Sequence, residues 1–207
     1  MHEFELVQKY KRFNATLEEN GYKYFATQNR EEAEHLLGQL NPTTVSPFFS
    51  ENTPMFKVES PYWSFVMADE FPIACCGARL LAPQLDYFNN AFFSMVAQDS
   101  VVKTVDNLPS LYHEPGLFAY AGNLFISENH RGKLWLLSGL VGHHISLTKV
   151  VWPQIKLTCW AMPVNHRPLL RFYPKPLAEP SLISLRYRDF SQPENFILIS
   201  KPWKESI

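Results

Sequence analysis

Residues 116–153, GLFAYAGNLFISENHRGKLWLLSGLVGHHISLTKVVWP, decide the fold. The aromatic-rich run 117–126 is typical of a strand, and the polar residues 127–132 after it predict a turn. The remainder has apolar positions at helical spacing. A helix that begins just after a strand presents unpaired backbone N–H groups and the positive end of its dipole. The stretch therefore predicts a strand, a turn and a helix, with an anion site at the turn that suits phosphate.

The composition is that of an ordinary globular protein. The 207 residues are 46% hydrophobic and 19% charged, with a net charge of -1, which favours one domain over residues 1–207 and argues against a nucleic-acid partner. The first residues lack the pattern of a signal peptide and no long apolar run follows, so we expect a cytoplasmic protein with no membrane partner. Cys75, Cys76 and Cys159 have neither a disulfide framework nor metal-ligand spacing, and we expect no metal.

The rest of the chain alternates helical and strand patterns around this stretch. We expect an α/β (α+β) fold with a central mixed, mostly antiparallel sheet flanked by helices. Residues 1–61 form an N-terminal helical region in this interpretation, and residues 62–207 form the sheet. The expected elements are helices over 4–19, 30–40, 83–106 and 169–173, strands over 22–26, 62–67, 72–81, 154–162, 182–187 and 196–200, and a loop over 43–61.

The long helix predicted after the turn carries two stripes at spacings of three and four. Glycine inside a helix costs about 1 kcal/mol relative to alanine. The stripe with two glycines therefore predicts a close approach, either by another backbone or by a ligand, whereas the other stripe is typical of a core face. The first stripe is Trp135, Gly139, Gly142, Ser146 and Lys149, and the second is Leu134, Leu137, Val141, Ile145 and Thr148.

Residues 125–133, FISENHRGK, resemble the end of the fourth strand and the coenzyme A loop of the GNAT acyltransferases. In that family a hydrophobic strand leads into an Arg-Gly turn and a long helix, followed by a strand and a short helix with an aromatic-Tyr pair. Here the last two are residues 154–162 and Phe172-Tyr173. The resemblance implies a single GNAT-like domain whose coenzyme-binding core is residues 62–207.

The resemblance also implies coenzyme contacts. The strand backbone would meet the pantetheine arm, and the turn N–H groups would hold the pyrophosphate. Leu134 and Leu136 depart from the family pattern, because small residues normally occupy those two positions and let a diphosphate approach closely. The implied residues are Phe125, Ile126 and Ser127 for pantetheine, and Arg131, Gly132, Lys133, Leu134, Trp135 and Leu136 for pyrophosphate.

For the chemistry, the resemblance points to Tyr173 as the acid that protonates the leaving thiolate, with Asn165 as a second catalytic candidate. The alternative for Tyr173 is a ring packed on the core with its hydroxyl at the surface. No base stands out, because the acidic residues at 69, 70 and 128 fall in turns.

Two other chemistries are disfavoured. His143 and His144 are adjacent on a helix and point about 100° apart, which is poor geometry for one metal. Cys75 and Cys76 could pair with a histidine at 113 or 130 as nucleophiles, yet no oxyanion hole can be placed beside them.

The function hypothesis is an acyl-CoA-dependent N- or O-acyltransferase that uses acetyl-CoA or a longer acyl-CoA. Its acceptor would be a small-molecule or protein amine, with contacts in residues 43–61 and 83–109. The aromatic residues 88, 92 and 93 leave room for a larger acyl group, and acyl carrier protein is an alternative donor. The rival hypothesis is a GNAT-fold module without transfer activity that serves in binding or as a homodimer.

Overall fold

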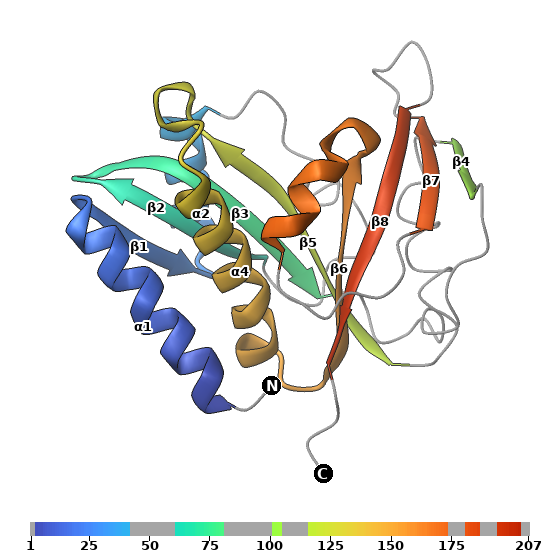
Figure 1. The fold of residues 1–207 in the computed structure, drawn as a ribbon, viewed down its shortest axis with the longest axis horizontal. Coiled ribbons are helices and arrows are strands. Elements are labelled where there is room, and N and C mark those ends of the chain that lie inside the picture. The colour runs from blue at the N-terminus through green and yellow to red at the C-terminus, as the bar shows by residue number, and fades with distance from the viewer. Residues whose placement is uncertain are drawn as a thin grey trace.

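A computed structural model describes residues 3–41, 61–80, 101–104, 116–173, 181–186 and 194–203. An eight-stranded sheet with the order β1-β2-β3-β5-β6-β8-β7-β4 connects its elements (Figure 1). The elements are α1 (Glu3–Glu19), β1 (Tyr22–Thr27), α2 (Arg30–Leu40), β2 (Tyr62–Ala68), β3 (Phe71–Leu80), β4 (Val101–Thr104), β5 (Leu117–Ile126), η4 (Glu128–His130), α4 (Leu134–Val151), β6 (Ile155–Pro163), η5 (Val164–Phe172), β7 (Ser181–Arg186) and β8 (Glu194–Pro202).

The first elements end where the local sequence predicts. Gly21, with φ of 75°, follows α1 and lets the chain turn into β1. Asn29 caps α2 by accepting a hydrogen bond from the amide of Glu32, and the left-handed Asn41 ends that helix. A turn with Asp69 at φ of 53° joins β2 to β3, and the two strands predicted over 62–67 and 72–81 pair as an antiparallel hairpin.

Helices cover both faces of the sheet. α1 and α4 lie side by side on one face, and α2 packs against the other (Figure 1). On the α2 face, Leu36 and Leu40 pack with Phe65 of β2 and Leu157 of β6. The α4 face has a core around Ile145, with a second cluster where α1 meets α4. The prediction of a mixed, mostly antiparallel sheet flanked by helices is confirmed, since among the described strands only β5 and β6 pair in parallel.

One predicted element is wrong at its end. Helical spacing over residues 83–106 predicts a helix, but Val101–Thr104 is strand β4, paired antiparallel with β7. The β-branched pair Val101-Val102 suits a strand, and the ladder to β7 overrides the local helical pattern. The remaining part of that prediction, residues 83–100, and the loop over 43–60 lie outside the described residues.

The two stripes of α4 differ in what they pack against. Val141, Ile145 and Thr148 are buried as expected, but Leu134 is 50% exposed, because it lies at the first residue of the helix beyond the sheet. On the other stripe, Gly139 packs against the ring of Phe13 from α1. The close approach at Gly139 is therefore helix-to-helix packing.

α4 is also long and apolar enough to span a membrane, on length and composition. Half of that segment is buried inside the protein, and the helix packs on β2, β3, β5 and β6. Its apolar character is explained by these contacts with the sheet.

The two helix glycines provide a matched test of this packing. A Cβ at position 139 would overlap the buried Phe13 ring, whereas a Cβ at position 142 would meet nothing within 4 Å. We expect Gly139→Ala to lower the free energy of unfolding by about 1–3 kcal/mol through overpacking. Gly142→Ala should raise it by up to about 1 kcal/mol through helix propensity. Urea unfolding of both variants measures these changes. Equal changes in the free energy of unfolding would contradict the close packing of Gly139 against Phe13.

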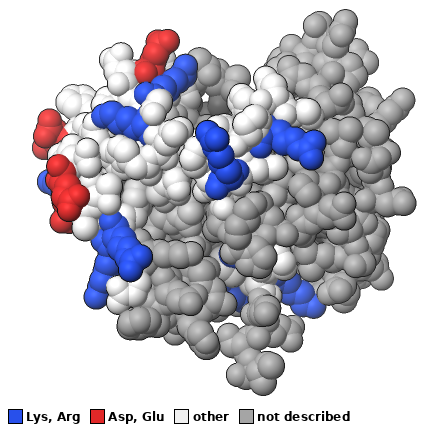
Figure 2. Space-filling model, in the orientation of Figure 1, with Lys and Arg blue, Asp and Glu red and all other residues white. Residues whose placement is uncertain are grey.

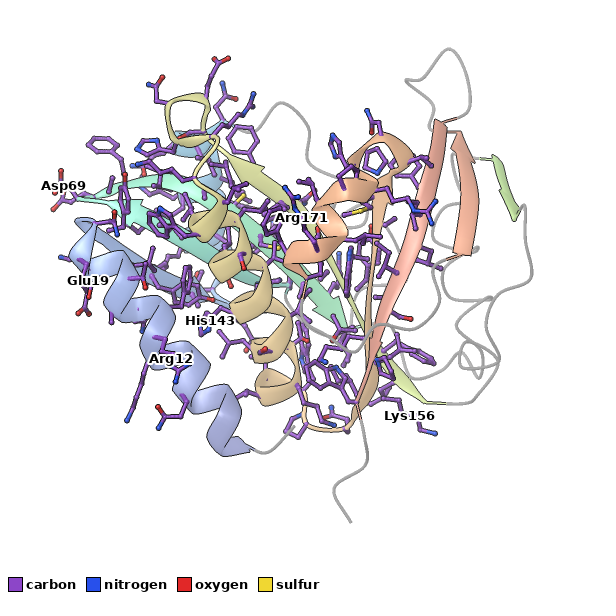
Figure 3. The ribbon with its side chains drawn as sticks, viewed as in Figure 1. Arg12, Glu19, Asp69, His143, Lys156 and Arg171 are labelled. Atoms are coloured by element: carbon purple, nitrogen blue, oxygen red, sulfur yellow. The ribbon has the colours of Figure 1, made fainter. Side chains whose placement is uncertain are left out.

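A buried polar network joins α4 to the sheet. His144 Nδ1 lies 2.6 Å from Ser64 Oγ, which lies 2.5 Å from the hydroxyl of Tyr24. The ring of His144 stacks on Tyr62 at 5.5 Å, and His143 contacts Tyr24 edge to face at 4.5 Å between α1 and α4 (Figure 3). Burial lowers the pKa of His143 to about 3, with a further contribution from His144, and lowers the pKa of His144 to about 4.

This network makes stability depend on pH. The folded-state pKa values lie below the unfolded value of about 6.5, so the contribution is fully present above that pH and is lost as the pH falls toward 4. We expect a loss of about 2 kcal/mol for each imidazole between pH 7.5 and pH 5. Urea unfolding across this range measures it. A His144→Gln variant should show a shallower dependence, and an identical one would contradict this assignment.

Candidate functional site

β5 and β6 pair only over their first residues. The parallel ladder runs from Leu117 with Ile155 to Tyr120 with Cys159. Beyond that point β5 continues along β3, and β6 continues along β8 as far as Pro163. Figure 1 shows the two strands diverging, with α4 and η5 on the same side of them. The sheet is therefore open between its two central strands.

A β-bulge accompanies the divergence. Cys75 pairs with Phe125 and Gly77 with Gly122, so two residues of β5 lie opposite the single residue Cys76. One of these two, Asn123, has φ of 52°, a left-handed conformation that asparagine tolerates better than most residues. A bulge bends its strand and increases the local twist. This bend helps to carry the end of β5 away from β6.

A cavity of about 360 Å³ occupies the opening. Its size lies within the range of small-molecule sites, and its wall comes from β3, β5, α4, β6 and η5. None of the described residues in that wall is Asp, Glu, Lys or Arg. The lining residues are Cys76, Ala121, Gly122, Asn123, Leu124, Phe125, Val141, Ile145, Trp160, Ala161, Met162, Pro163, His166, Leu169 and Tyr173.

Trp160 and Tyr173 form the wall on the β6 side. Their rings stack at 4.8 Å with an interplanar angle of 11°. Trp160 is 3% exposed, and its indole Nε1 is buried without a hydrogen-bond partner among the described residues. A buried N–H without an acceptor is unfavourable. The indole N–H therefore remains an unsatisfied donor in the core beside the cavity.

Burial changes the pKa of two titratable groups in this wall. Burial raises the pKa of the Tyr173 phenol, with a smaller contribution from Cys76, and burial also raises the pKa of the Cys76 thiol. Tyr173 therefore keeps its proton near neutral pH and can donate it. His166, on η5, is exposed, and its imidazole is the one side chain in the described lining that can serve as a general base.

The turn that follows β5 has a fixed shape. The amide of Ser127 donates to the carbonyl of Ile73 at 2.8 Å, and Arg131 Nε donates to the carbonyl of Ile126 at 3.1 Å. His130 Nδ1 lies 2.9 Å from Ser127 Oγ. Burial, with the charge of Lys133, lowers the pKa of His130 and keeps that imidazole neutral. The turn is thus held before any ligand arrives.

Helix α4 begins without a side-chain cap. Its first amides that bond within the helix are those of Leu136 and Leu137, both to the carbonyl of Lys133. The preceding residue Gly132 has φ of 84°, and nothing lies within 4 Å of the place where a Cβ would stand. Figure 2 shows Lys and Arg atoms on the part of this face where the turn and η5 lie, together with Asp or Glu atoms at the turn. The donors and charge of this turn suit a phosphate.

The predicted site residues separate into three groups. Phe125 and Tyr173 line the cavity, whereas Asn165 is exposed and is absent from its wall. Leu136 is fully buried in the core beneath α4, so its side chain does not occupy the turn. The others belong to the strand end and the turn: Ile126, Ser127, Arg131, Gly132, Lys133, Leu134 and Trp135.

Sequence reasoning missed three cavity residues. Asn123 is the left-handed residue of the bulge, Trp160 carries the free indole N–H, and His166 adds an imidazole. Two features of the sequence could have pointed to them: Asn123 interrupts an otherwise apolar strand, and Trp160 lies within another apolar strand.

The disfavoured chemistries gain no support from the described residues. Cys75 and Cys76 are both buried, and burial raises the pKa of Cys75 to about 12, so neither is a ready thiolate. No group of three or more His, Cys, Asp or Glu suited to a metal occurs in the described parts of the chain.

No protein-family model matches the sequence, and a search of curated proteins finds no match. Solved structures do share the fold. The chain is similar to NAA60 of Arabidopsis thaliana in complex with acetyl-CoA, at 11% identity, 88% of this chain, 99% of that chain and a TM-score of 0.50. It is also similar to FeeM, an N-acyl amino acid synthase from uncultured soil microbes, at 8% identity, 87% and 90% coverage and a TM-score of 0.52.

A third structure is an acetyltransferase of the GNAT family from Streptococcus pneumoniae, at 8% identity, 88% and 100% coverage and a TM-score of 0.50. At such identities a structural likeness shows the fold alone. The chain has the GNAT fold, and the resemblance read from residues 125–133 is confirmed at that level.

Proposed function

We propose that the protein is an acyl-CoA-dependent acyltransferase that acts on an amine. The observation that carries the proposal is the opening between β5 and β6. There a cavity whose described lining has no Asp, Glu, Lys or Arg lies on the strand that leads into the turn before α4. The similar proteins of known structure include one in complex with acetyl-CoA and one named as an N-acyl amino acid synthase. Both descriptions fit transfer of an acyl group to nitrogen.

The residues present fit coenzyme A in two respects. At the turn, the open left-handed Gly132 and the uncapped start of α4 offer backbone N–H groups for a pyrophosphate, beside the exposed Arg131. In the opening, strand β5 has lost its β6 partner from Ala121 onward. Its free edge can bond an amide-containing chain such as pantetheine, as an added strand would.

In the proposed mechanism, acyl-CoA supplies a thioester carbonyl that the acceptor amine attacks. A carbon–nitrogen bond forms and the carbon–sulfur bond breaks. Tyr173, whose ring stacks on Trp160 in the cavity wall, donates its phenolic proton to the departing sulfur. The amine loses its proton to His166 or to water.

Coenzyme binding is the first test. Thermal unfolding with 1 mM CoA or acetyl-CoA should show a stabilisation of about 2.7 kcal/mol if the ligand is at about 100 times its Kd, a shift of roughly 5–10 °C for a chain of this size. Arg131→Glu should reduce the shift, because it places a negative charge beside the phosphates and removes the hydrogen bond from Arg131 Nε to the carbonyl of Ile126. Arg12→Glu, at an exposed position on α1, is the matched control and should keep the full shift (Figure 3). If neither ligand raised the melting temperature, the proposal of an acyl-CoA-dependent acyltransferase would be refuted.

Tyr173→Phe tests the chemistry once a competent acceptor is found. We expect kcat to fall at least about 10- to 100-fold, with the KM for acyl-CoA nearly unchanged, because only the proton donor is removed. Tyr62→Phe is the control, since Tyr62 is a buried tyrosine outside the cavity wall. Steady-state release of free CoA thiol measures both. An unchanged kcat would remove Tyr173 from the mechanism.

The alternative function is a GNAT-fold binding module. It is favoured by Leu134, which is half exposed where the family has a small residue. Binding of CoA without any transfer to amines would support this alternative.

A further inference from the structure

In the proposed function, on which this inference rests, Tyr173 is the proton donor, and it stands at the end of a short element. Its amide donates to the carbonyl of Leu170 at 3.2 Å, at the end of the 3-10 helix η5. Hydrogen bonds in a 3-10 helix have poorer geometry than those in an α-helix, and Pro168 lacks an N–H. The backbone of η5 therefore holds the phenol weakly, and a side-chain contact has to fix its ring.

Trp160 of β6 makes that contact. The two rings stack with 4.8 Å between their centroids and an angle of 11° between their planes. Trp160 is 3% exposed and Tyr173 is 9% exposed, and both belong to the core cluster around Ile145. Buried aromatic rings attract each other at this separation, and neither can turn in a packed core without losing the contact. The stack therefore restricts the phenol to one plane.

Trp160 is itself held at the point where β5 and β6 part. The preceding residue, Cys159, pairs with Tyr120, where the ladder to β5 ends. Trp160 is thus the first residue of β6 past that ladder, and it remains paired with Ile199 of β8 on the other edge. A side chain on a paired strand is placed more precisely than one on a loop. The stack therefore ties the position of Tyr173 to the place where the strands part.

The phenol of Tyr173 lies toward the opening. Both stacked rings line the cavity, and the titratable groups in its described wall are Cys76 of β3, His166 of η5 and Tyr173 itself. The Cys76 thiol contributes to the raised pKa of Tyr173, after the larger effect of burial, so the thiol and the phenol lie within electrostatic reach of each other. The stack therefore fixes the donor where the proposed function places the thioester.

We propose that Trp160 is a positioning residue for acyl transfer, whose ring holds the Tyr173 phenol in the orientation from which its proton passes to the departing sulfur. The carbon–sulfur bond breaks, the sulfur keeps the electron pair and takes the phenolic proton, and the proton that the amine releases returns to the phenolate. Trp160 touches none of the reacting atoms. Replacing Trp160 should therefore affect the chemistry only while Tyr173 carries its hydroxyl group.

Steady-state release of CoA thiol from acetyl-CoA, with glycinamide as the amine, tests this coupling. Trp160→Leu should lower kcat about 10-fold or more at an unchanged KM for acetyl-CoA, because a misplaced donor is a poor one. Trp160→Phe keeps a ring against Tyr173 and should stay within about threefold of the wild-type kcat. In a Tyr173→Phe background, Trp160→Leu should change kcat less than about twofold, because no phenol remains to be positioned.

Two further variants separate this effect from a loss of folding, which urea unfolding monitors. Trp160→Met replaces the ring with an adaptable apolar chain and serves if Trp160→Leu does not fold. Trp63→Leu is the matched control and should keep the wild-type kcat. Trp63 is also buried and stacks on Phe65 at 6.3 Å, but it belongs to the core cluster on the α2 face, outside the cavity wall.

The pH profile of kcat gives a readout that a purely structural role of Trp160 would not move. Burial raises the pKa of the Tyr173 phenol, so the donor is lost only when the pH rises far enough to ionise it. Trp160→Leu admits water beside the phenol and should lower this pKa, which moves the alkaline limb of kcat about one pH unit lower. Trp160→Phe should leave the limb in place, and Tyr173→Phe should abolish it.

The outcomes separate this inference from the proposed function. If the wild-type protein transfers the acetyl group and the effects of Trp160→Leu and Tyr173→Phe on kcat multiply, the inference is wrong and the acyltransferase stands. The same conclusion follows if Trp160→Phe is as damaging as Trp160→Leu, or if the alkaline limb does not move. If the wild-type protein releases no thiol, the proposed function is refuted for amines of this kind, and the inference falls with it.

Discussion

The site depends on the hydrogen-bond ladder between β5 and β6, and on where that ladder stops. In the described part of the chain these strands are the only parallel neighbours, and they pair from Leu117 to Tyr120 on β5. After Tyr120, the bulge at Asn123 and the pairing of β6 with β8 lead the two strands apart. Unpaired backbone inside a protein is unfavourable unless a ligand satisfies it. An opening at this place is therefore most easily explained as a binding site.

The packing around the opening explains how the fold tolerates it. α4 is anchored away from the cavity by Gly139 against Phe13 and by the bonded pair His144 and Ser64. Val141 and Ile145 of the same helix border the cavity and are almost completely buried in the core. Rigid anchoring on one side and an apolar wall on the other suit a site that must remain open without ligand.

Much of this architecture was predictable from local sequence, because caps, breakers and apolar periods act over short distances. Gly21, Asn29 and Asn41 mark helix ends that the structure reproduces, and the stretch 116–153 forms the predicted strand, turn and helix. Strand β4 was mistaken for helix, since its conformation depends on pairing with the distant β7. The cavity could not be predicted for the same reason, because it depends on contacts between distant segments. Trp160 meets Tyr173 only after β6 and η5 have packed together.

Hydrogen exchange with and without coenzyme A tests the central claim most directly. If the pantetheine arm lies against the open edge of β5 and the pyrophosphate lies at the start of α4, CoA should slow amide exchange in residues 122–127 and 131–136. Strand β7, which β8 separates from β6 in the sheet, should exchange as before. Protection confined to other segments, or none at a saturating CoA concentration, would contradict the account.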